Sequence, residues 1–206
     1  MEKTKFNIFF RKILNKKNQK KLKNKTFSLI ANNCNGTFLY HDLGIKYYSP
    51  FINLSLNTED FIKYLKNISH YMNSELTFLK EKEYSFPVGI LDDIKINFVH
   101  YATEELAKEK WNERTKRLNL NNLFILLTVD SDCDEKLLKD FDSLPFKNKI
   151  IFTNSPTLKS SSTFYIKDFI MEGSAPHGFY KFINRFSGKR YYDQFDYIKW
   201  FNNELY

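Results

Sequence analysis

The run Asn122–Val129 constrains the fold more than any other part of the sequence. It is the most apolar stretch of the chain, and polar residues follow it directly. A continuous apolar run of this length is typical of a strand that is buried on both faces. Such strands occur mainly in parallel sheets that helices cover on both sides. The run therefore predicts a central strand of an α/β domain.

Helix-like and strand-like segments alternate on either side of this run. Predicted helices are Glu59–Met72 after a Thr58 cap, Thr103 to about Leu118, Asp134–Phe141, and two short ones near Phe179–Phe186 and Phe195–Glu204. Predicted strands are Phe27–Asn32, Phe86–Leu91, Ile94–Tyr101, Lys149–Thr153 and Phe164–Lys167. Asn33–Leu56 is predicted as a long connection. This alternation predicts a three-layer α/β domain with a mostly parallel or mixed sheet.

The net charge of +8 comes from the N-terminus of the chain. Residues 1–25 carry ten basic residues and one acid, whereas residues 26–206 carry 22 basic and 23 acidic residues. We therefore expect a basic N-terminal tail, residues 1–25, and a single near-neutral α/β domain, residues 26–206. The overall charge gives no information about the ligand of that domain.

The tail has an amphipathic pattern. Phe6, Phe9, Phe10, Ile13 and Leu14 recur at roughly helical spacing, with lysines around them. A basic amphipathic helix can lie on an anionic membrane surface, where each Lys or Arg contributes about 1 kcal/mol. The alternatives are a mobile basic leader, or a helix packed on its own domain or on a second subunit. Nucleic-acid binding is the weaker interpretation, because nothing later in the chain resembles a base-reading module.

Cysteine usage and hydropathy suggest a cytoplasmic protein. Two cysteines are too few for a disulfide framework, which favours a reducing compartment. No apolar run approaches the roughly 18 residues of a membrane span. The N-terminus also lacks the apolar stretch and cleavage site of a signal peptide.

Polar residues follow three of the predicted strands. These loops are Asn32–Gly36, His100-Tyr101 and Asp130–Cys133. In a parallel sheet, loops at the carboxyl ends of neighbouring strands converge, and ligands bind there. If the three strands are parallel neighbours, we expect their polar side chains to line one pocket.

The first two loops suggest a nucleophile and its base. Cys34 would need a base to form a thiolate, and His100 is the candidate. The amides of Asn32 and Asn33 could donate hydrogen bonds to a substrate oxygen. The alternative is that Cys34 is a buried, inert thiol.

The third loop and the helix after His100 suggest metal and phosphate contacts. Asp130 and Asp132 have the spacing of paired carboxylates that hold Mg²⁺ or Mn²⁺ against a nucleotide-sugar donor. Asp132 and Asp134 could instead cap the next helix. Arg114 is a candidate phosphate contact on a helix whose charged side is otherwise interpreted as solvated. The sequence has no glycine-rich phosphate loop and no established hydrolase or zinc motif.

Seven segments of the sequence form a recognisable set of motifs: Ile30–Gly36, Tyr48-Ser49-Pro50, Phe86–Gly89, His100-Tyr101, Ala107–Arg114, Asp142–Lys149 and Ile151-Phe152-Thr153. Together they resemble a bacterial family, domain of unknown function 1919, which is often labelled exopolysaccharide biosynthesis protein. The resemblance covers roughly Phe27 to the C-terminus. It implies a Rossmann-like fold and a role in making capsule or other surface polysaccharide, but no particular reaction.

The residues and the resemblance lead to one functional expectation. We expect a cytoplasmic transferase, peripheral on the inner face of the plasma membrane, that moves a glycosyl, acyl or similar group onto a saccharide or lipid-linked saccharide intermediate. Its expected catalytic residues are Cys34, His100 and Asp130, its substrate contacts Asn32, Asn33, Tyr101 and Arg114, and its metal ligands Asp130 and Asp132. The alternative is a non-catalytic, membrane-associated scaffold of the assembly machinery.

Overall fold

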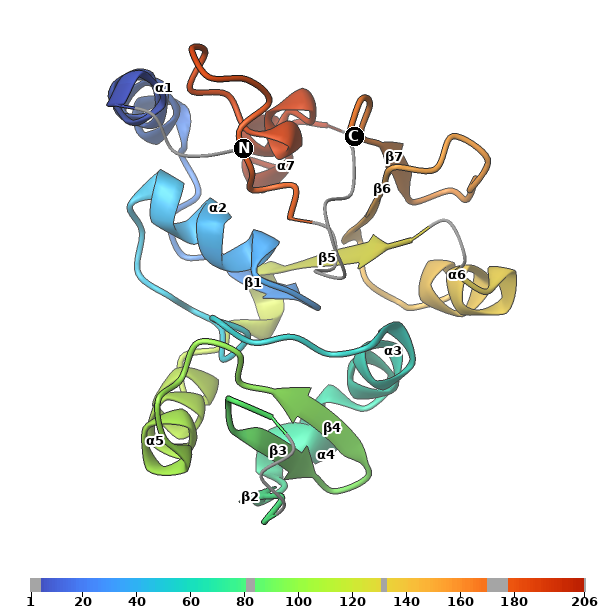
Figure 1. The fold of residues 1–206 in the computed structure, drawn as a ribbon. Helices are drawn as coiled ribbons and strands as arrows, with labels where there is room; N and C mark the ends of the chain where they lie inside the picture. Colours follow the sequence, from blue (N-terminus) through green and yellow to red (C-terminus); the bar gives the residue numbers. More distant parts are fainter. Residues whose placement is uncertain (1–4, 81–83, 131–132, 170–177, 206) are drawn as a thin grey trace.

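A four-stranded parallel sheet forms the centre of the molecule (Figure 1). The computed structural model describes residues 5–80, 84–130, 133–169 and 178–205. The sheet has the order β1 (Ser28–Ala31), β5 (Leu123–Val129), β6 (Asn148–Thr153) and β7 (Thr163–Tyr165). All seven residues of β5 are buried, and β5 lies between β1 and β6. The predicted central strand and parallel sheet are thus confirmed.

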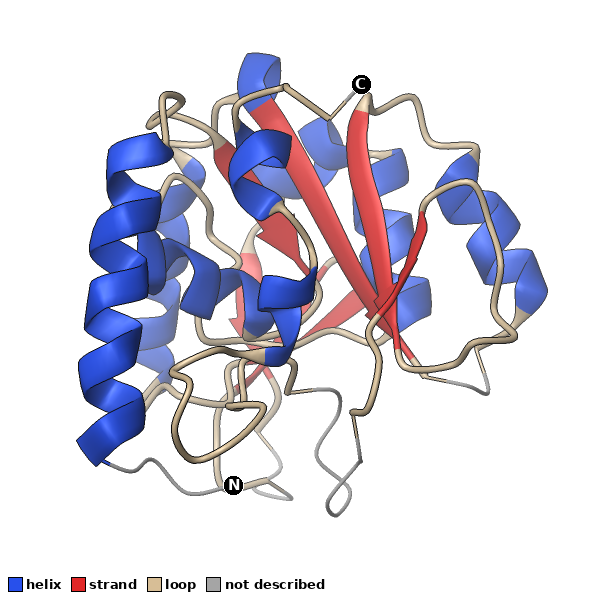
Figure 2. Cartoon of the chain, turned by 90° about the horizontal axis from the view of Figure 1, so that it is seen from above, coloured by secondary structure: helices blue, strands red, loops and turns tan. Residues whose placement is uncertain are grey.

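Helices cover both faces of this sheet, which gives the three expected layers (Figure 2). Along β5, Phe124 and Leu126 belong to one hydrophobic cluster, whereas Ile125 and Leu127 belong to the other. Helices α2 (Asn35–Leu43) and α7 (Tyr197–Phe201) pack in the first cluster, and α3 (Thr58–Lys66) and α6 (Glu135–Asp142) pack in the second. Successive residues of β5 fall in different clusters because side chains along a strand point alternately to the two faces of the sheet.

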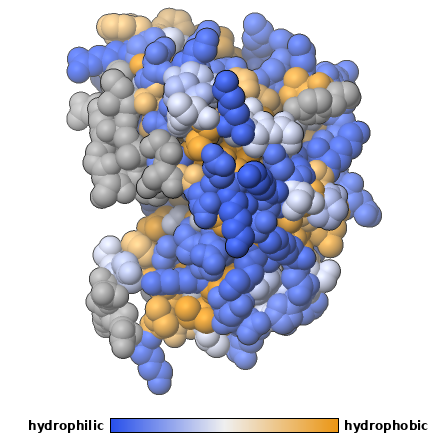
Figure 3. Space-filling view, turned by 90° about the vertical axis from the view of Figure 1, so that its right-hand side faces the viewer, coloured by the Kyte–Doolittle hydropathy of each residue, from blue (hydrophilic) through white to orange (hydrophobic). Residues whose placement is uncertain are grey.

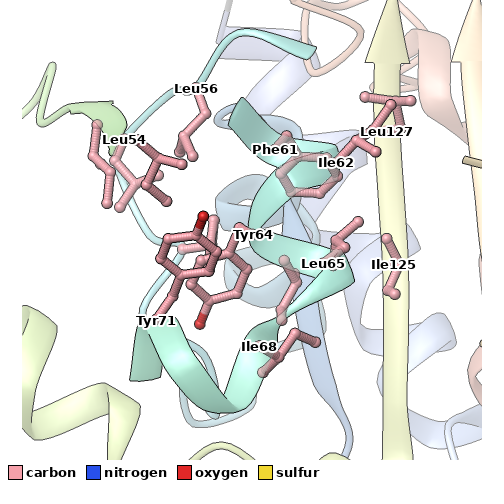
Figure 4. Close-up of a cluster of buried hydrophobic side chains, with 14 of the residues drawn as sticks. Leu54, Leu56, Phe61, Ile62, Tyr64, Leu65, Ile68, Tyr71, Ile125 and Leu127 are labelled. Carbon is pink, nitrogen blue, oxygen red and sulfur yellow. The ribbon is translucent and has the colours of Figure 1, made fainter. Parts of the chain in front are cut away.

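Helix α3 buries an apolar stripe against β5, as Figure 4 shows. Its N-cap is Asn57, whose Oδ1 accepts a hydrogen bond from the Asp60 amide at 2.7 Å, so the expected Thr58 cap was wrong by one residue. The predicted helix Glu59–Met72 is interrupted at Asn67. Its second part is α4 (Ile68–Asn73).

A small antiparallel sheet, at the bottom of Figure 1, contributes side chains to the same hydrophobic cluster as α3 and α6. It consists of β2 (Leu76–Phe78), β3 (Val88–Leu91) and β4 (Ile94–Asn97). Strands β3 and β4 lie within the predicted strands Phe86–Leu91 and Ile94–Tyr101 and form a hairpin, whereas β2 was not predicted and β4 ends before Tyr101. Helix α5 (Glu104–Thr115) begins as expected after Thr103, whose hydroxyl accepts from the Leu106 amide at 3.2 Å.

The basic N-terminal segment is a helix, α1 (Lys5–Lys21), that packs on the rest of the protein. Its buried side chains are polar: Asn7 and Arg11. The apolar stripe predicted from the spacing exists, but Phe6, Phe9, Phe10 and Ile13 are exposed. Of the alternatives, the packed helix is the one observed, and the side that faces inward is the polar one with Asn7 and Arg11 rather than the apolar stripe that hydropathy alone favours.

Two further expectations were wrong. The predicted connection Asn33–Leu56 contains α2, because the polar cluster after β1 begins a helix rather than a loop. The expected helix near Phe179–Phe186 is a series of bends and turns, in which Phe182 bridges to Arg190. A short 3₁₀ helix, Tyr191–Gln194, follows and leads into α7.

Candidate functional site

A pocket of about 550 Å³ lies at the carboxyl ends of β1 and β5. It is the position at which parallel sheets generally bind ligands. Strand ends, the start of α3, the residue that ends β4 and the start of α6 all contribute to its wall. The lining residues are Asn32, Asn33, Ser55, Leu56, Asn57, Thr58, Asn97, Thr128, Val129, Asp130, Cys133, Asp134 and Leu137.

Asn32 joins the two strands at the base of the pocket. Its side chain donates to the Thr128 carbonyl at 3.0 Å and accepts from the Thr128 amide at 2.9 Å. Its own carbonyl accepts from the Leu56 amide at 2.9 Å, which attaches the segment leading into α3. The nitrogen and the oxygen of the Asn32 side-chain amide therefore both bind the backbone of β5. Asn32 was predicted as a substrate contact, and these hydrogen bonds give it a structural role as the alternative.

The neighbouring asparagines turn the chain from β1 into α2. The Asn33 Oδ1 accepts from the Asn35 amide at 3.0 Å, and Asn33 remains at the pocket wall. The Asn35 side chain is fully buried, donating to the Thr128 hydroxyl at 3.2 Å and accepting from the Tyr180 amide at 3.1 Å. Asn33 is thus the member of this cluster that is available to face a ligand.

The small sheet contributes Asn97 to the pocket wall. Ser55 and Asn97 exchange two backbone hydrogen bonds of 2.8 and 2.9 Å, so the segment before α3 is fixed to the end of β4. The Asn97 side chain is half-buried and lines the pocket. These two residues and Asn57 were not predicted. No local signal identifies Asn97, because it falls inside the predicted strand Ile94–Tyr101 and its contact with Ser55 spans 42 residues.

The lining side chains are mostly uncharged hydrogen-bonding groups. Among the described residues, no Lys or Arg lines the pocket, and its charged members are Asp130 and Asp134. The Asp134 carboxylate accepts from the Lys136 amide at 2.8 Å and caps α6, as the capping interpretation expected. Amide and hydroxyl groups both donate and accept, so this wall is suited to a ligand with many hydroxyls.

The proposed metal pair cannot be assembled from the described residues alone. Asp130 lines the pocket, whereas Asp132 lies outside the described residues. In the parts of the chain that the structure describes, no group of three or more His, Cys, Asp or Glu side chains is arranged to hold a metal ion. The Mg²⁺ or Mn²⁺ site therefore stays a prediction.

Cys34 lies at the N-cap of α2 rather than in a loop. Burial raises the pKa of its thiol to about 11, which keeps it protonated near neutrality. Within the described residues, Cys34 is not part of the pocket wall and no hydrogen bond joins it to His100, whose side chain is exposed. This environment is that of the inert thiol, the alternative to a nucleophile.

Tyr101 and Arg114 pair with each other. The Arg114 guanidinium donates to the Tyr101 hydroxyl at 2.5 Å and lies over the Tyr47 ring, 5.4 Å from its centroid. The Tyr101 hydroxyl also donates to the Ile52 carbonyl at 2.9 Å. Burial raises the pKa of Tyr101, although the charge of Arg114 opposes this shift. These contacts attach α5 to the segment after α2, and neither residue is among the described residues that line the pocket.

The expected convergence of three loops holds for two of them. Strands β1 and β5 are parallel neighbours, so Asn32, Asn33 and Asp130 meet. Strand β4 belongs to the antiparallel sheet, so the premise that His100 and Tyr101 follow a neighbouring parallel strand was wrong. The alternating burial of β4 fits an antiparallel strand, but the sequence does not show which strands are neighbours, because strand pairing joins residues that are distant in the chain.

Comparison with known proteins supports the family assignment. The model of the family described as "Domain of unknown function (DUF1919)" matches residues 5–202, so the match includes α1 and extends beyond the expected start at Phe27. A Haemophilus influenzae protein described as "Uncharacterized protein" is 46% identical over 190 residues, which are 92% of this chain and 91% of the relative. The chain belongs to the DUF1919 family of domains of unknown function.

Proposed function

We propose that the protein transfers a glycosyl, acyl or similar group onto a saccharide intermediate of surface-polysaccharide assembly. The observation that carries this proposal is the pocket wall, which Asn33, Asn97, Ser55 and Thr58 line together with Asp130 and to which no basic side chain among the described residues contributes. A neutral, polyhydroxylated ligand pairs with such groups without leaving a buried charge unmatched. The family resemblance supports the saccharide, while the group transferred rests on the chemistry that the pocket could provide.

Asp130 is the candidate general base. In the proposed reaction, the acceptor hydroxyl gives its proton to the Asp130 carboxylate and its oxygen forms a bond to the donor carbon. The bond between that carbon and the donor's leaving group breaks, and the leaving group takes the electron pair. A nucleoside diphosphate would be the leaving group of a nucleotide-sugar donor, and Asp130 with Asp132 would hold a divalent ion for it.

We also place the protein at an anionic membrane surface, where lipid-linked saccharides would be found. No helix within the described residues is both long and apolar enough to cross a bilayer. Association would therefore be peripheral, through the cationic helix α1.

Ligand-detected NMR with a panel of hexoses, hexosamines and their uridine diphosphate derivatives, each with and without Mn²⁺, tests the saccharide proposal. Asn97→Ala should weaken binding by about tenfold, because the loss of one or two hydrogen bonds to a ligand costs about 1.5 kcal/mol. Asn112→Ala, on the exposed side of α5, is the matched control and should bind as the wild-type protein does. Saccharide signals that are unaffected by Asn97→Ala would contradict this assignment of the pocket.

The scaffold alternative has one observation in its favour. The thiol that would act as nucleophile is protonated near neutrality and is not hydrogen-bonded to His100 in the described structure. The two functions differ in the Asp130→Asn variant. A transferase should lose turnover while keeping saccharide binding, whereas a scaffold should show no turnover in either protein with any donor of the panel.

A further inference from the structure

Exposed aromatic side chains gather where α1 meets the hairpin-like segment Phe182–Arg190. Phe6, Phe9 and Phe10 of α1 are 61%, 60% and 40% exposed, and Phe186 of the segment is 67% exposed. The rings of Phe6 and Phe186 lie 6.2 Å apart between centroids. By contrast, the face of the molecule shown in Figure 3 is mostly hydrophilic. Apolar side chains that gather in this way mark an interaction surface.

The segment Phe182–Arg190 is fixed to α1, so the aromatic side chains form one surface. The Asn7 side chain donates to the Asn184 carbonyl at 2.9 Å and accepts from the Gly188 amide at 3.1 Å. Gly188 has a φ of +65°, and a Cβ there would lie 2.5 Å from the Arg11 backbone nitrogen. The glycine thus permits a close approach that a larger residue would prevent. In Figure 1 the segment lies beside α1 at the top of the molecule.

The charges around this surface are positive. Helix α1 contains no acidic residue, and its six lysines are exposed: Lys5, Lys12, Lys16, Lys17, Lys20 and Lys21. Arg185 and Lys189 on the neighbouring segment are also exposed. A second copy of the chain would bring two such surfaces together and place like charges face to face. An anionic bilayer matches both the aromatic side chains and the surrounding cations.

We propose that Phe6, Phe9, Phe10, Ile13 and Phe186 form a rigid membrane-docking surface that inserts among anionic lipids. This inference rests on the membrane association proposed above and specifies its structure. Two distant parts of the chain form this docking surface, because Phe186 lies 180 positions after Phe6. Since α1 is held to the domain, docking also fixes how the saccharide pocket is oriented relative to the lipid.

Co-sedimentation of the full chain with phosphatidylcholine vesicles, with and without phosphatidylglycerol, tests the surface. The wild-type protein should bind the phosphatidylglycerol vesicles, and added salt should weaken binding because it screens the lysines. Phe186→Ala should weaken binding about tenfold, since it removes much of one inserted side chain. Lys16→Gln should weaken it about fivefold, the equivalent of about 1 kcal/mol for one cation. Leu106→Ala, an exposed apolar residue on α5, is the matched control and should bind as the wild-type protein does.

A direct measure of insertion complements the affinities. Phe186→Trp should be quenched by brominated acyl chains in phosphatidylglycerol vesicles, whereas Leu106→Trp should not. If Phe186→Ala binds as tightly as the wild-type protein and Phe186→Trp is not quenched, the composite surface is wrong, although association through α1 stands. If the wild-type protein binds no vesicle, the membrane association itself is wrong as well. A dimer in sedimentation velocity that Phe9→Ala dissociates would overturn the inference in favour of a second copy.

Discussion

At the scale of single residues, the hydrogen bonds of the polar residues after β1 decide which of them can contact a ligand. From the sequence, Asn32 and Asn33 are candidates for substrate contact, and Cys34 beside them is the candidate nucleophile. The structure uses Asn32 and Asn35 to join β1, β5 and α2, and leaves Asn33 at the pocket wall. An amide in a sequence is equally suited to either role, so only its neighbours in space distinguish them.

Cys34 gives a residue-scale prediction about reactivity. Because burial raises the pKa of its thiol to about 11, the thiolate fraction at pH 8 is small. We expect iodoacetamide to alkylate Cys34 about two orders of magnitude more slowly than a model thiol with a pKa of about 8.5. Mass spectrometry of the modified protein should show the rate rising about tenfold per pH unit between pH 8 and 10. Rapid alkylation at neutral pH would instead indicate an activated nucleophile.

At the scale of secondary structure, the sequence predicted those helices and strands that have a clear local signal, such as an N-cap or a continuous apolar run. The helix after Thr103 and the strand β5 were found where expected, because an N-cap and a continuous apolar run are local signals. Helix α2 was missed, since its first residues Asn35 and Gly36 are typical of loops. Gly36 is placed there by packing, because a Cβ on it would lie 2.7 Å from the Ala31 Cβ.

The cap of α3 gives a prediction at this scale. The Asn57 side chain satisfies the Asp60 amide at the start of the helix. Asn57→Ala should lower the free energy of unfolding by about 1 kcal/mol, the usual contribution of an N-cap. Urea denaturation followed by circular dichroism measures this change. Asn112→Ala, at an exposed position inside α5, is the control and should not lower the midpoint, because Ala favours a helix more than Asn does. Equal midpoints for both variants would mean that the Asn57 hydrogen bond contributes nothing net.

At the scale of the whole molecule, a buried ionic cluster connects the two ends of the chain. Asp42 on α2 is 2% exposed and pairs with Arg11 of α1 at 2.7 Å and with the Arg190 Nε at 2.8 Å. Tyr192 donates a hydrogen bond to the same carboxylate, and Arg11 also pairs with Asp193 at 2.5 Å. Helix α1 is therefore held by charges rather than by its apolar residues, which leaves the apolar residues free to face outward.

This cluster predicts how stability depends on pH. Burial alone would raise the pKa of Asp42, but the charges of Arg11 and Arg190 outweigh it and lower the pKa below its ordinary value. A carboxyl with a lowered folded-state pKa stabilises the fold above its unfolded pKa of about 3.9, and this stabilisation is lost as the pH falls through the folded value. Asp42→Asn should cost about 3–5 kcal/mol at pH 7, because it leaves two buried guanidinium groups without their shared partner.

Urea denaturation between pH 7 and pH 2 measures both effects. The wild-type protein should lose stability below about pH 4, and Asp42→Asn should lose less over the same range because the titrating group is gone. Asp93→Asn, which removes an exposed carboxylate paired with Lys63, is the control and should change stability little at pH 7. An identical acid profile for Asp42→Asn and the wild-type protein would show that Asp42 does not govern the acid response.

The sequence by itself determined the α/β class, the central strand β5 and the position of the polar residues after β1 and β5, because burial patterns and caps depend on residues close together in the chain. The tertiary structure decided which face of α1 is buried and which strand ends form the pocket. Arg11 meets Asp42 and Asp193 across 31 and 182 residues, and Ser55 meets Asn97 across 42. Pairings at such separations leave no periodic signal in the sequence. The apolar stripe of α1 was therefore predicted correctly, whereas the residues against which α1 packs were not predicted.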